Sequence, residues 1–447
     1  MNDFFGSLWW LLITLGVLVT FHEFGHFWVG RHFGVKVLRF SVGFGKPVWS
    51  RIGRDGTEYA IGGIPLGGYV KFLDEREGDV APEDLGQAFN RKPVWQRMLI
   101  VAAGPVFNIV LCVALLWGML VIGRPDYAPV IGHVEGITAA AGIQPGDRIV
   151  RIDGDDIPTW NDALPALARN AIAHRAVTVD VRGAAGESAH MLRLDQLPAR
   201  INEIELLSDI GMEPQHMTVP PVVGEVPASG ASAGLLQPGD RIVGVNGSAV
   251  TVFEDIRPLV QKTAAGAPVQ LTVARAGQTL AVAIVPTVQG KSRLLGVTPK
   301  LPAGDSRPKY DTVRRLGPVQ AVPAAIHETS ALLRDSVTMI GRMIRGQAPR
   351  ESVSGPVTIA RIANSSAQMG PAWFLRFLAL MSLSLGVLNL LPIPILDGGH
   401  LAMYAIEAVR GRPLGERALA ISQSIGLMLI LGLMGLAFYN DFFGHFH

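Results

Sequence analysis

Four stretches of the chain are apolar over about the length that crosses a lipid bilayer. They are Leu8–Val29, Met98–Ile122, Phe377–Leu396 and Ala418–Tyr439. A spanning helix needs about 20 mostly apolar residues, because an unpaired backbone polar group in hydrocarbon is costly. We therefore predict a multi-pass α-helical membrane protein whose four transmembrane helices, with their flanks, occupy residues 1–30, 98–122, 371–400 and 418–439.

The first stretch differs from a cleaved signal peptide in two ways. Met1–Ser7 contains no basic residue, only Asp3, and no small-residue cleavage site follows the apolar run. We expect it to remain as a helix of the mature protein.

Lysine and arginine residues gather in two of the connections between these stretches. Segment 31–97 contains Arg31, Lys36, Arg39, Lys46, Arg51 and Arg54, and the last connection contains Arg410, Arg412 and Arg417. Both termini, Met1–Ser7 and Asn440–His447, have none. Because basic loops stay in the cytoplasm, we predict that both termini and the large Gly123–Gly370 region lie outside.

The region between the second and third stretches contains an internal repeat. Gln144-Pro-Gly-Asp-Arg-Ile-Val150 returns unchanged as Gln237–Val243, and Pro129–Val134 returns in similar form as Pro221–Val226. Short Val/Ile-rich runs broken by Pro-Gly-Asp and Asn-Gly turns indicate strands and hairpins. We predict two small, mainly β domains at residues 123–217 and 218–302, which either bind peptides or act only as spacers.

Residues 303–370 are expected to form a helical linker. Ile326, Leu333, Val337, Ile340 and Ile344 share one face of a helix. This face is expected either to lie in the membrane interface or to pack against the repeated domains.

The composition of the chain limits which functions and which types of metal ligand are expected. The 39 basic and 37 acidic residues nearly cancel, which argues against a nucleic-acid binder. Charged residues make up only 17% of the chain, a deficit that agrees with contact to a lipid bilayer. The chain has one cysteine, Cys112, so a metal would be held mainly by histidine and carboxylate.

A metal-binding pattern lies in the far half of the first apolar stretch. His22-Glu-Phe-Gly-His26 is an H-E-x-x-H sequence, whose two histidines share a helical face while Glu23 reaches a bound water. Ionisable groups in a spanning helix are costly and normally functional. The alternative is a polar cluster that only packs between helices.

A catalytic zinc ion usually has three protein ligands and an open position. Asp397 is our candidate for the third ligand, because we expect the third apolar helix to place it near the cytoplasmic side, at the depth of His22 and His26. Pro392 and Pro394 should loosen that helix and free carbonyl groups that need a cavity. The alternative is that Asp397 only caps the helix end before Gly398-Gly399.

Taken together, these motifs resemble the site-2 protease family of intramembrane zinc metalloproteases. The resemblance rests on His22–His26, on Asn389 through Gly399, on Gly104-Pro-Val-Phe-Asn108 and on the repeated domains, and it covers nearly the whole chain. It implies that His22, His26 and Asp397 hold one Zn²⁺ and that Glu23 is the catalytic base. It also implies that the repeats are tandem PDZ domains in the periplasm of a bacterium, whose inner membrane holds the rest.

The resemblance further implies a re-entrant, membrane-associated β-hairpin at about 58–72, which would hold a substrate helix in extended form by strand addition. An ordinary cytoplasmic hairpin is the alternative. We expect substrate contacts from Gly62, Gly63, Ile64, Asn389, Pro392 and Pro394. Gly104, Pro105 and Asn108 either contact substrate or let helices pack closely.

The sequence therefore predicts an intramembrane protease that cuts single-span membrane proteins, with no nucleic-acid partner. The family suggests a trimmed anti-sigma factor or remnant signal peptides as substrates, and a peptide or trimmed terminus as PDZ ligand. The alternatives are a membrane-anchored PDZ scaffold with an inactive metal site and, less well supported, a metal transporter.

Overall fold

The computed structural model describes residues 2–198, 206–264, 266–289, 292–301, 309–345, 355–412 and 415–443. Parts of both predicted repeats and of the predicted 303–370 linker lie outside these ranges. The chain divides into two compact units, one made of Met1–Arg124 with Arg315–His447 and the other of Pro125–Arg314. Each unit is described by itself.

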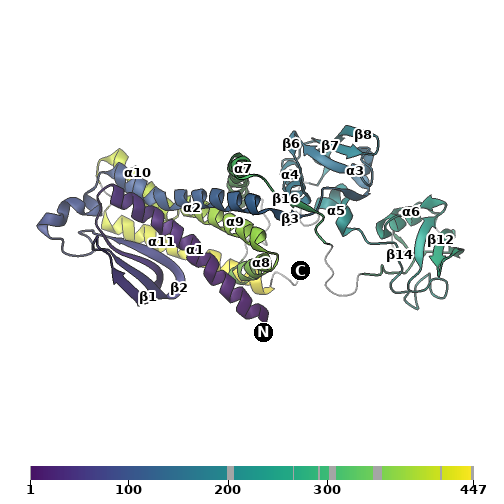
Figure 1. The fold of residues 1–447 in the computed structure, drawn as a ribbon, viewed down its shortest axis with the longest axis horizontal. Coiled ribbons are helices and arrows are strands. Elements are labelled where there is room, and N and C mark those ends of the chain that lie inside the picture. The colour runs from purple at the N-terminus through teal and green to yellow at the C-terminus, as the bar shows by residue number, and fades with distance from the viewer. Residues whose placement is uncertain are drawn as a thin grey trace. The chain divides into compact units, whose positions relative to one another are not determined.

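The first unit is built around four long apolar helices (Figure 1). They are α1 (Asn2–His32), α2 (Val94–Ile122), α9 (Pro371–Leu390) and α11 (Glu416–Phe443). Each contains a segment long and apolar enough to cross a membrane, namely Phe4–His32, Val94–Ile122, Pro371–Leu390 and Leu419–Asp441. Helix α2 contacts both α1 and α9. The prediction of a multi-pass membrane protein with four long apolar helices is confirmed.

The third long helix is shorter than predicted. Helix α9 ends at Leu390, and Asp397 begins a separate helix, α10 (Asp397–Arg410). Pro392 and Pro394 lack an N–H and disfavour helical backbone in the residue before them. The expectation of one helix over residues 371–400 was therefore wrong, and an irregular segment, residues 391–396, presents Asp397.

A sheet lies beside α1, formed by the long strands β1 (Val37–Ile52) and β2 (Glu58–Phe72) (Figure 1). Both strands bend, so the first half of β1 pairs on both sides: Phe40 faces Tyr59 on one side and Val70 on the other. Gly43, with φ of 91°, and Gly67, with φ of 121°, adopt backbone conformations at the bends that favour glycine. The expected hairpin inside 58–72 was wrong, because that segment is one bent strand and the hairpin covers 37–72.

Two amphipathic helices complete the first unit, α7 (Pro318–Ile344) and α8 (Pro356–Gln368). Helix α7 packs on α2 and α9 through a face of small residues that includes Ala321, Ala325 and Thr329. Leu333 and Ile340 of the predicted face pack against this cluster, whereas Ile326 and Val337 are 51% and 59% exposed. The predicted face is therefore only partly packed, and its contact with the membrane interface stays a prediction.

The second unit contains two sheets of the same design. In the first, β6 (Asp155–Asp156), β5 (Arg148–Ile152), β7 (Val177–Gly183) and β8 (Gly186–Leu192) lie side by side in that order. In the second, the order is β11 (Ser248–Ala249), β10 (Arg241–Val245), β12 (Val269–Arg275) and β13 (Gln278–Ile284). Each sheet has its own apolar core, with α4 (Trp160–Ile172) packed in the first and α6 (Ile256–Gln261) in the second.

The repeated Gln-Pro-Gly-Asp segment forms the same turn in both copies. The Asp147 carboxylate accepts a hydrogen bond from the Gln144 amide at 2.8 Å, and Asp240 accepts one from Gln237 at 2.8 Å. The second unit also contains these short elements: β3 (Arg124–Asp126), whose first residue belongs to the first unit, β4 (Ile131–Val134), α3 (Gly136–Ala140), α5 (Leu206–Ile210), β9 (Met212–Pro214), β14 (Thr287–Gln289), β15 (Ser292–Leu294) and β16 (Thr312–Arg314).

Candidate metal centre

Helix α1 presents the H-E-x-x-H residues to α2 at a place where the two helices come close together. A side chain at Gly25 would lie 2.9 Å from the Ala103 carbonyl carbon, so only glycine permits this approach. Small residues at such contacts let helix backbones pack closely in a membrane. His22 and His26, four positions apart, therefore point into the interior of the helix cluster, and His22 is buried.

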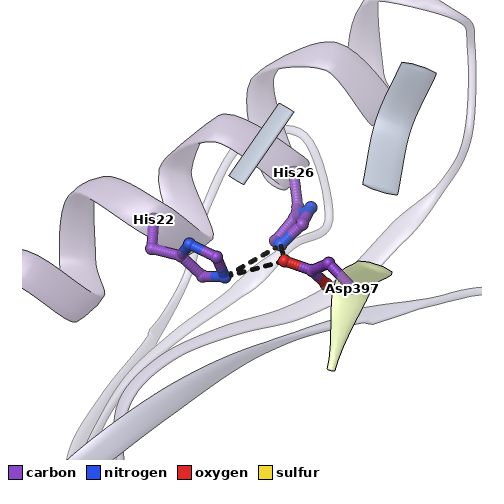
Figure 2. Close-up of side chains that lie close together, drawn as sticks. All are labelled: His22, His26 and Asp397. Atoms are coloured by element: carbon purple, nitrogen blue, oxygen red, sulfur yellow. Dashed lines mark hydrogen bonds and ion pairs between the residues drawn. The ribbon is translucent and has the colours of Figure 1, made fainter. Parts of the chain in front are cut away.

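The structure brings His22, His26 and Asp397 together (Figure 2). Asp397 Oδ2 lies 3.1 Å from His22 Nε2 and 3.5 Å from His26 Nε2, and the two Nε2 atoms are 3.3 Å apart. Figure 2 shows both imidazole rings on one helix, turned towards the carboxylate at the start of α10. The segment with Pro392 and Pro394 thus delivers a side chain that is 371 residues from His26 in the chain.

These three residues fit a zinc ion. Zinc binds imidazole nitrogen and carboxylate oxygen at about 2.0–2.2 Å, so neighbouring ligands of a tetrahedral site are about 3.3 Å apart. The three measured separations, 3.1, 3.3 and 3.5 Å, bracket that value. In addition, Asp397 Oδ2 is buried and accepts no hydrogen bond within the described residues, which is costly unless a cation is its partner.

Helix α2 supports both rings from behind. The His26 Nδ1–H donates to the Ile100 carbonyl at 2.8 Å, which leaves Nε2 free to face Asp397. His22 Nδ1 lies 3.1 Å from the side-chain amide of Asn108. Between these contacts, a side chain at Gly104 would lie 2.6 Å from His26 Cε1 and 2.8 Å from His22 Cε1. A residue larger than glycine at position 104 would therefore collide with both imidazole rings.

The cluster opens into a cavity of about 380 Å³. Glu23 lines this cavity together with His22, His26 and Asp397. Val70 of β2 lines the same cavity. The last part of β2 thus runs along the site.

Only one of the residues predicted to contact substrate lines this cavity. Asn389 lines the cavity, whereas Gly62, Gly63, Ile64, Pro392 and Pro394 are not among its lining residues. Gly62 instead lies at a bend of the sheet, where a side chain would be 2.5 Å from the Phe44 carbonyl oxygen. Whether these residues bind substrate stays a prediction.

Several residues that line the cavity were not singled out from the sequence. They include Tyr69, Val70, Phe72, His400 and Tyr404. His400 could have been singled out from the sequence, because it is a titratable residue three positions after Asp397. The aromatic residues of β2 could not, because alternation along a strand does not show which of its faces packs against a neighbouring element.

A second cavity, of about 430 Å³, adjoins the first and shares six of its lining residues, among them Tyr69, His400 and Tyr404. Charged residues contribute to its wall, among them the Arg97–Glu407 ion pair at 2.7 Å.

Comparison with known proteins agrees with this geometry. The model of peptidase family M50 matches residues 10–433. A Xylella fastidiosa (strain 9a5c) protein, named as a candidate zinc metalloprotease, is 48% identical over 99% of this chain and 100% of its own. The Regulator of sigma-E protease RseP of Salmonella typhimurium (strain 14028s / SGSC 2262) is 42% identical over 96% of this chain and 97% of its own. The protein of the same name from Escherichia coli (strain K12) is 40% identical over 99% of both chains.

Proposed function

The chain belongs to peptidase family M50 and is a membrane zinc metalloprotease, and from this premise we propose that it hydrolyses peptide bonds within transmembrane segments of single-span proteins. The observation that supports this most strongly is the set of three ligand atoms beside Glu23, in a cavity formed by spanning helix α1 and its neighbours. Ionisable residues inside spanning helices are costly and normally functional.

His22, His26 and Asp397 would hold one Zn²⁺ in this proposal. When bound, zinc supplies a Lewis acid that polarises the scissile carbonyl and makes water acidic enough to give up a proton near neutral pH. Glu23 takes that proton on its carboxylate and passes it to the leaving nitrogen. The apolar surroundings strengthen every charge interaction at the site.

The edge of the β1–β2 sheet is our candidate for the substrate-holding surface. Residues 68–72 pair with β1 on one side, and no other described strand pairs with their second side. A transmembrane helix hides its carbonyls in its own hydrogen bonds and must be unwound before attack. Strand addition along this edge would hold the unwound segment next to Glu23.

We propose that the enzyme lies in a bacterial inner membrane with its site towards the cytoplasm. The basic residues of segments 31–97 and 410–417 support this orientation. The two repeats of the second unit are then periplasmic PDZ domains. Their identical sheet order and their shared Gln-Pro-Gly-Asp turn support a common domain type.

The name that two relatives share, Regulator of sigma-E protease RseP, suggests a substrate class. We propose an anti-sigma factor already trimmed outside the membrane, with the PDZ domains admitting the trimmed form by its exposed terminus. Remnant signal peptides are a second class of single-span substrate with the same shape.

Substituting Glu23 by Gln tests the proposal. The amide keeps the size of the side chain but accepts no proton, so we expect zinc to be retained and cleavage of a co-expressed single-span reporter to be lost. Glu83→Gln is the matched control, since Glu83 is an exposed carboxylate away from the cavity. Unchanged cleavage in Glu23→Gln would exclude Glu23 as the base. A wild-type protein that binds zinc but never cuts a trimmed reporter would instead favour a PDZ scaffold with an idle metal site.

A further inference from the structure

Asn108 of α2 is a fully buried amide that contacts a metal ligand. Its side-chain amide lies 3.1 Å from His22 Nδ1, and the residue has no exposed surface. Its Oδ1 atom, as placed, meets no hydrogen-bond donor within the described residues. A buried carbonyl oxygen without a donor costs about 1–3 kcal/mol, so the orientation of this amide has an energetic consequence.

The two orientations of the amide select different forms of the His22 ring. If Nδ2–H donates to Nδ1, a neutral ring carries its proton on Nε2, the atom 3.1 Å from Asp397 Oδ2. That nitrogen then has no lone pair for a metal. If the amide is exchanged end for end, Oδ1 accepts from Nδ1–H, and the Nε2 lone pair points to the cluster.

The second orientation matches the arrangement at His26. There the Ile100 carbonyl accepts from Nδ1–H at 2.8 Å and leaves Nε2 as the ligand atom. Ile100, Gly104 and Asn108 are spaced by four residues and share one face of α2. This face therefore offers an acceptor to each ring, with Gly104 making room between them.

Helix α9 holds this part of α2 in place. The Ser382 hydroxyl donates to the Asn108 backbone carbonyl at 2.8 Å. A side chain at Gly386 would lie 3.0 Å from the Pro105 carbonyl oxygen and 3.3 Å from Asn108 Cβ, so the two helices are in close contact here. Asn108 thus sits on a rigid support rather than on a mobile loop.

We propose that Asn108 is a positioning residue that accepts a hydrogen bond from His22 Nδ1–H and so fixes the ring form that binds zinc. This inference rests on the proposed metal site and assigns to Asn108 a role that acts only through His22. Outer hydrogen-bond partners of this kind typically change metal affinity by about 10–100-fold when removed.

The test compares Asn108→Leu with Asn108→Asp in the full-length protein in detergent. Leucine has the same number and branching of side-chain heavy atoms but accepts no hydrogen bond, whereas aspartate keeps the acceptor. We expect the zinc affinity, measured by competition with a chromophoric chelator, to fall about 10–100-fold in Asn108→Leu and to stay within about threefold of wild type in Asn108→Asp. Thermal unfolding of the metal-free proteins shows whether each variant folds.

If Asn108 had only a structural role, the zinc affinities of the two variants would fall in the opposite order. An apolar side chain would suit the helix contact, while a buried charge would disturb it. Equal zinc affinity in wild type and folded Asn108→Leu would overturn the proposal, as would an equal loss in both variants. Ser382→Ala, which leaves the Asn108 amide intact, should keep its zinc affinity within about threefold of wild type. If the wild-type protein itself bound no zinc, the proposed function would be contradicted. That result differs from the two outcomes that contradict only the role of Asn108.

Discussion

The glycine beneath the two imidazoles gives the sharpest test of the metal centre. Gly104→Ala adds one methyl group to α2 at a point where Cβ would lie 2.6 Å from His26 Cε1 and 2.8 Å from His22 Cε1. Carbon atoms in contact are about 3.5–4.0 Å apart. Both rings must therefore move by about 1 Å, away from α2 and from their hydrogen-bond acceptors.

A displacement of this size matters more for catalysis than for folding. Misplacing a reacting group by about 1 Å costs about 100-fold in rate. The fold is affected less, because side chains yield rather than backbone, and alanine favours a helix over glycine by about 1 kcal/mol. We expect Gly104→Ala to fold, to lose at least about tenfold in zinc affinity and to cut a single-span reporter about 100-fold more slowly.

Gly118→Ala is the matched control on the same helix. A side chain there would meet only Leu375 Cδ1, at an ordinary 3.5 Å. It changes the helix propensity of α2 equally but leaves the imidazoles untouched. The reasoning would be refuted if folded Gly104→Ala bound zinc and cut the reporter as well as Gly118→Ala does.

Two further predictions concern other parts of the chain. Gly426→Ala in α11 should slow reporter cleavage, because its Cβ would overlap the Pro394 carbonyl oxygen and push the segment that carries Asp397. Gly432→Ala, the control, has nothing near its Cβ and should leave cleavage unchanged. Equal cleavage rates in the two variants would contradict this prediction. In the second repeat, the Arg275 guanidinium beside Asp240 holds the pKa of that carboxyl below its usual value. The stabilisation is therefore full above pH 3.8, the ordinary pKa, and is lost as the pH falls through the lowered one. Asp240→Asn should lower the local stability of β10 and β12 by about 2 kcal/mol, so hydrogen exchange of these strands at pH 7 should become faster. Asp147→Asn should have a smaller effect, because the first repeat has Gly183 beside Asp147, where the second repeat has Arg275. Equal effects of the two substitutions would exclude the ion pair as the cause.

The sequence predicted those features that depend on local pattern and on the cost of charge in lipid. Four apolar stretches of sufficient length gave the long helices, and His22, His26 and Asp397 were singled out because ionisable groups are rarely tolerated there. The Gln-Pro-Gly-Asp repeat predicted two similar domains because a turn depends on four adjacent residues.

Features that depend on long-range contacts could not be predicted in the same way. The bends at Gly43 and Gly67 exist because both halves of β2 pair with the same part of β1, which no short window of sequence reveals. Ala321 and Ala325 of α7 are fully buried against the same cluster as Leu333 and Ile340, although no spacing of large apolar residues singles them out. The contact of Asn108 with His22 depends on the rotation of α2 relative to α1.

The first unit is assembled from two separate parts of the chain, with Pro125–Arg314 inserted between them. A ribosome therefore finishes both histidines long before it reaches Asp397, 371 residues after His26. Two imidazoles are too few to form a three-ligand catalytic zinc site, so a site made of these three residues is complete only after Asp397 has been added to the growing chain.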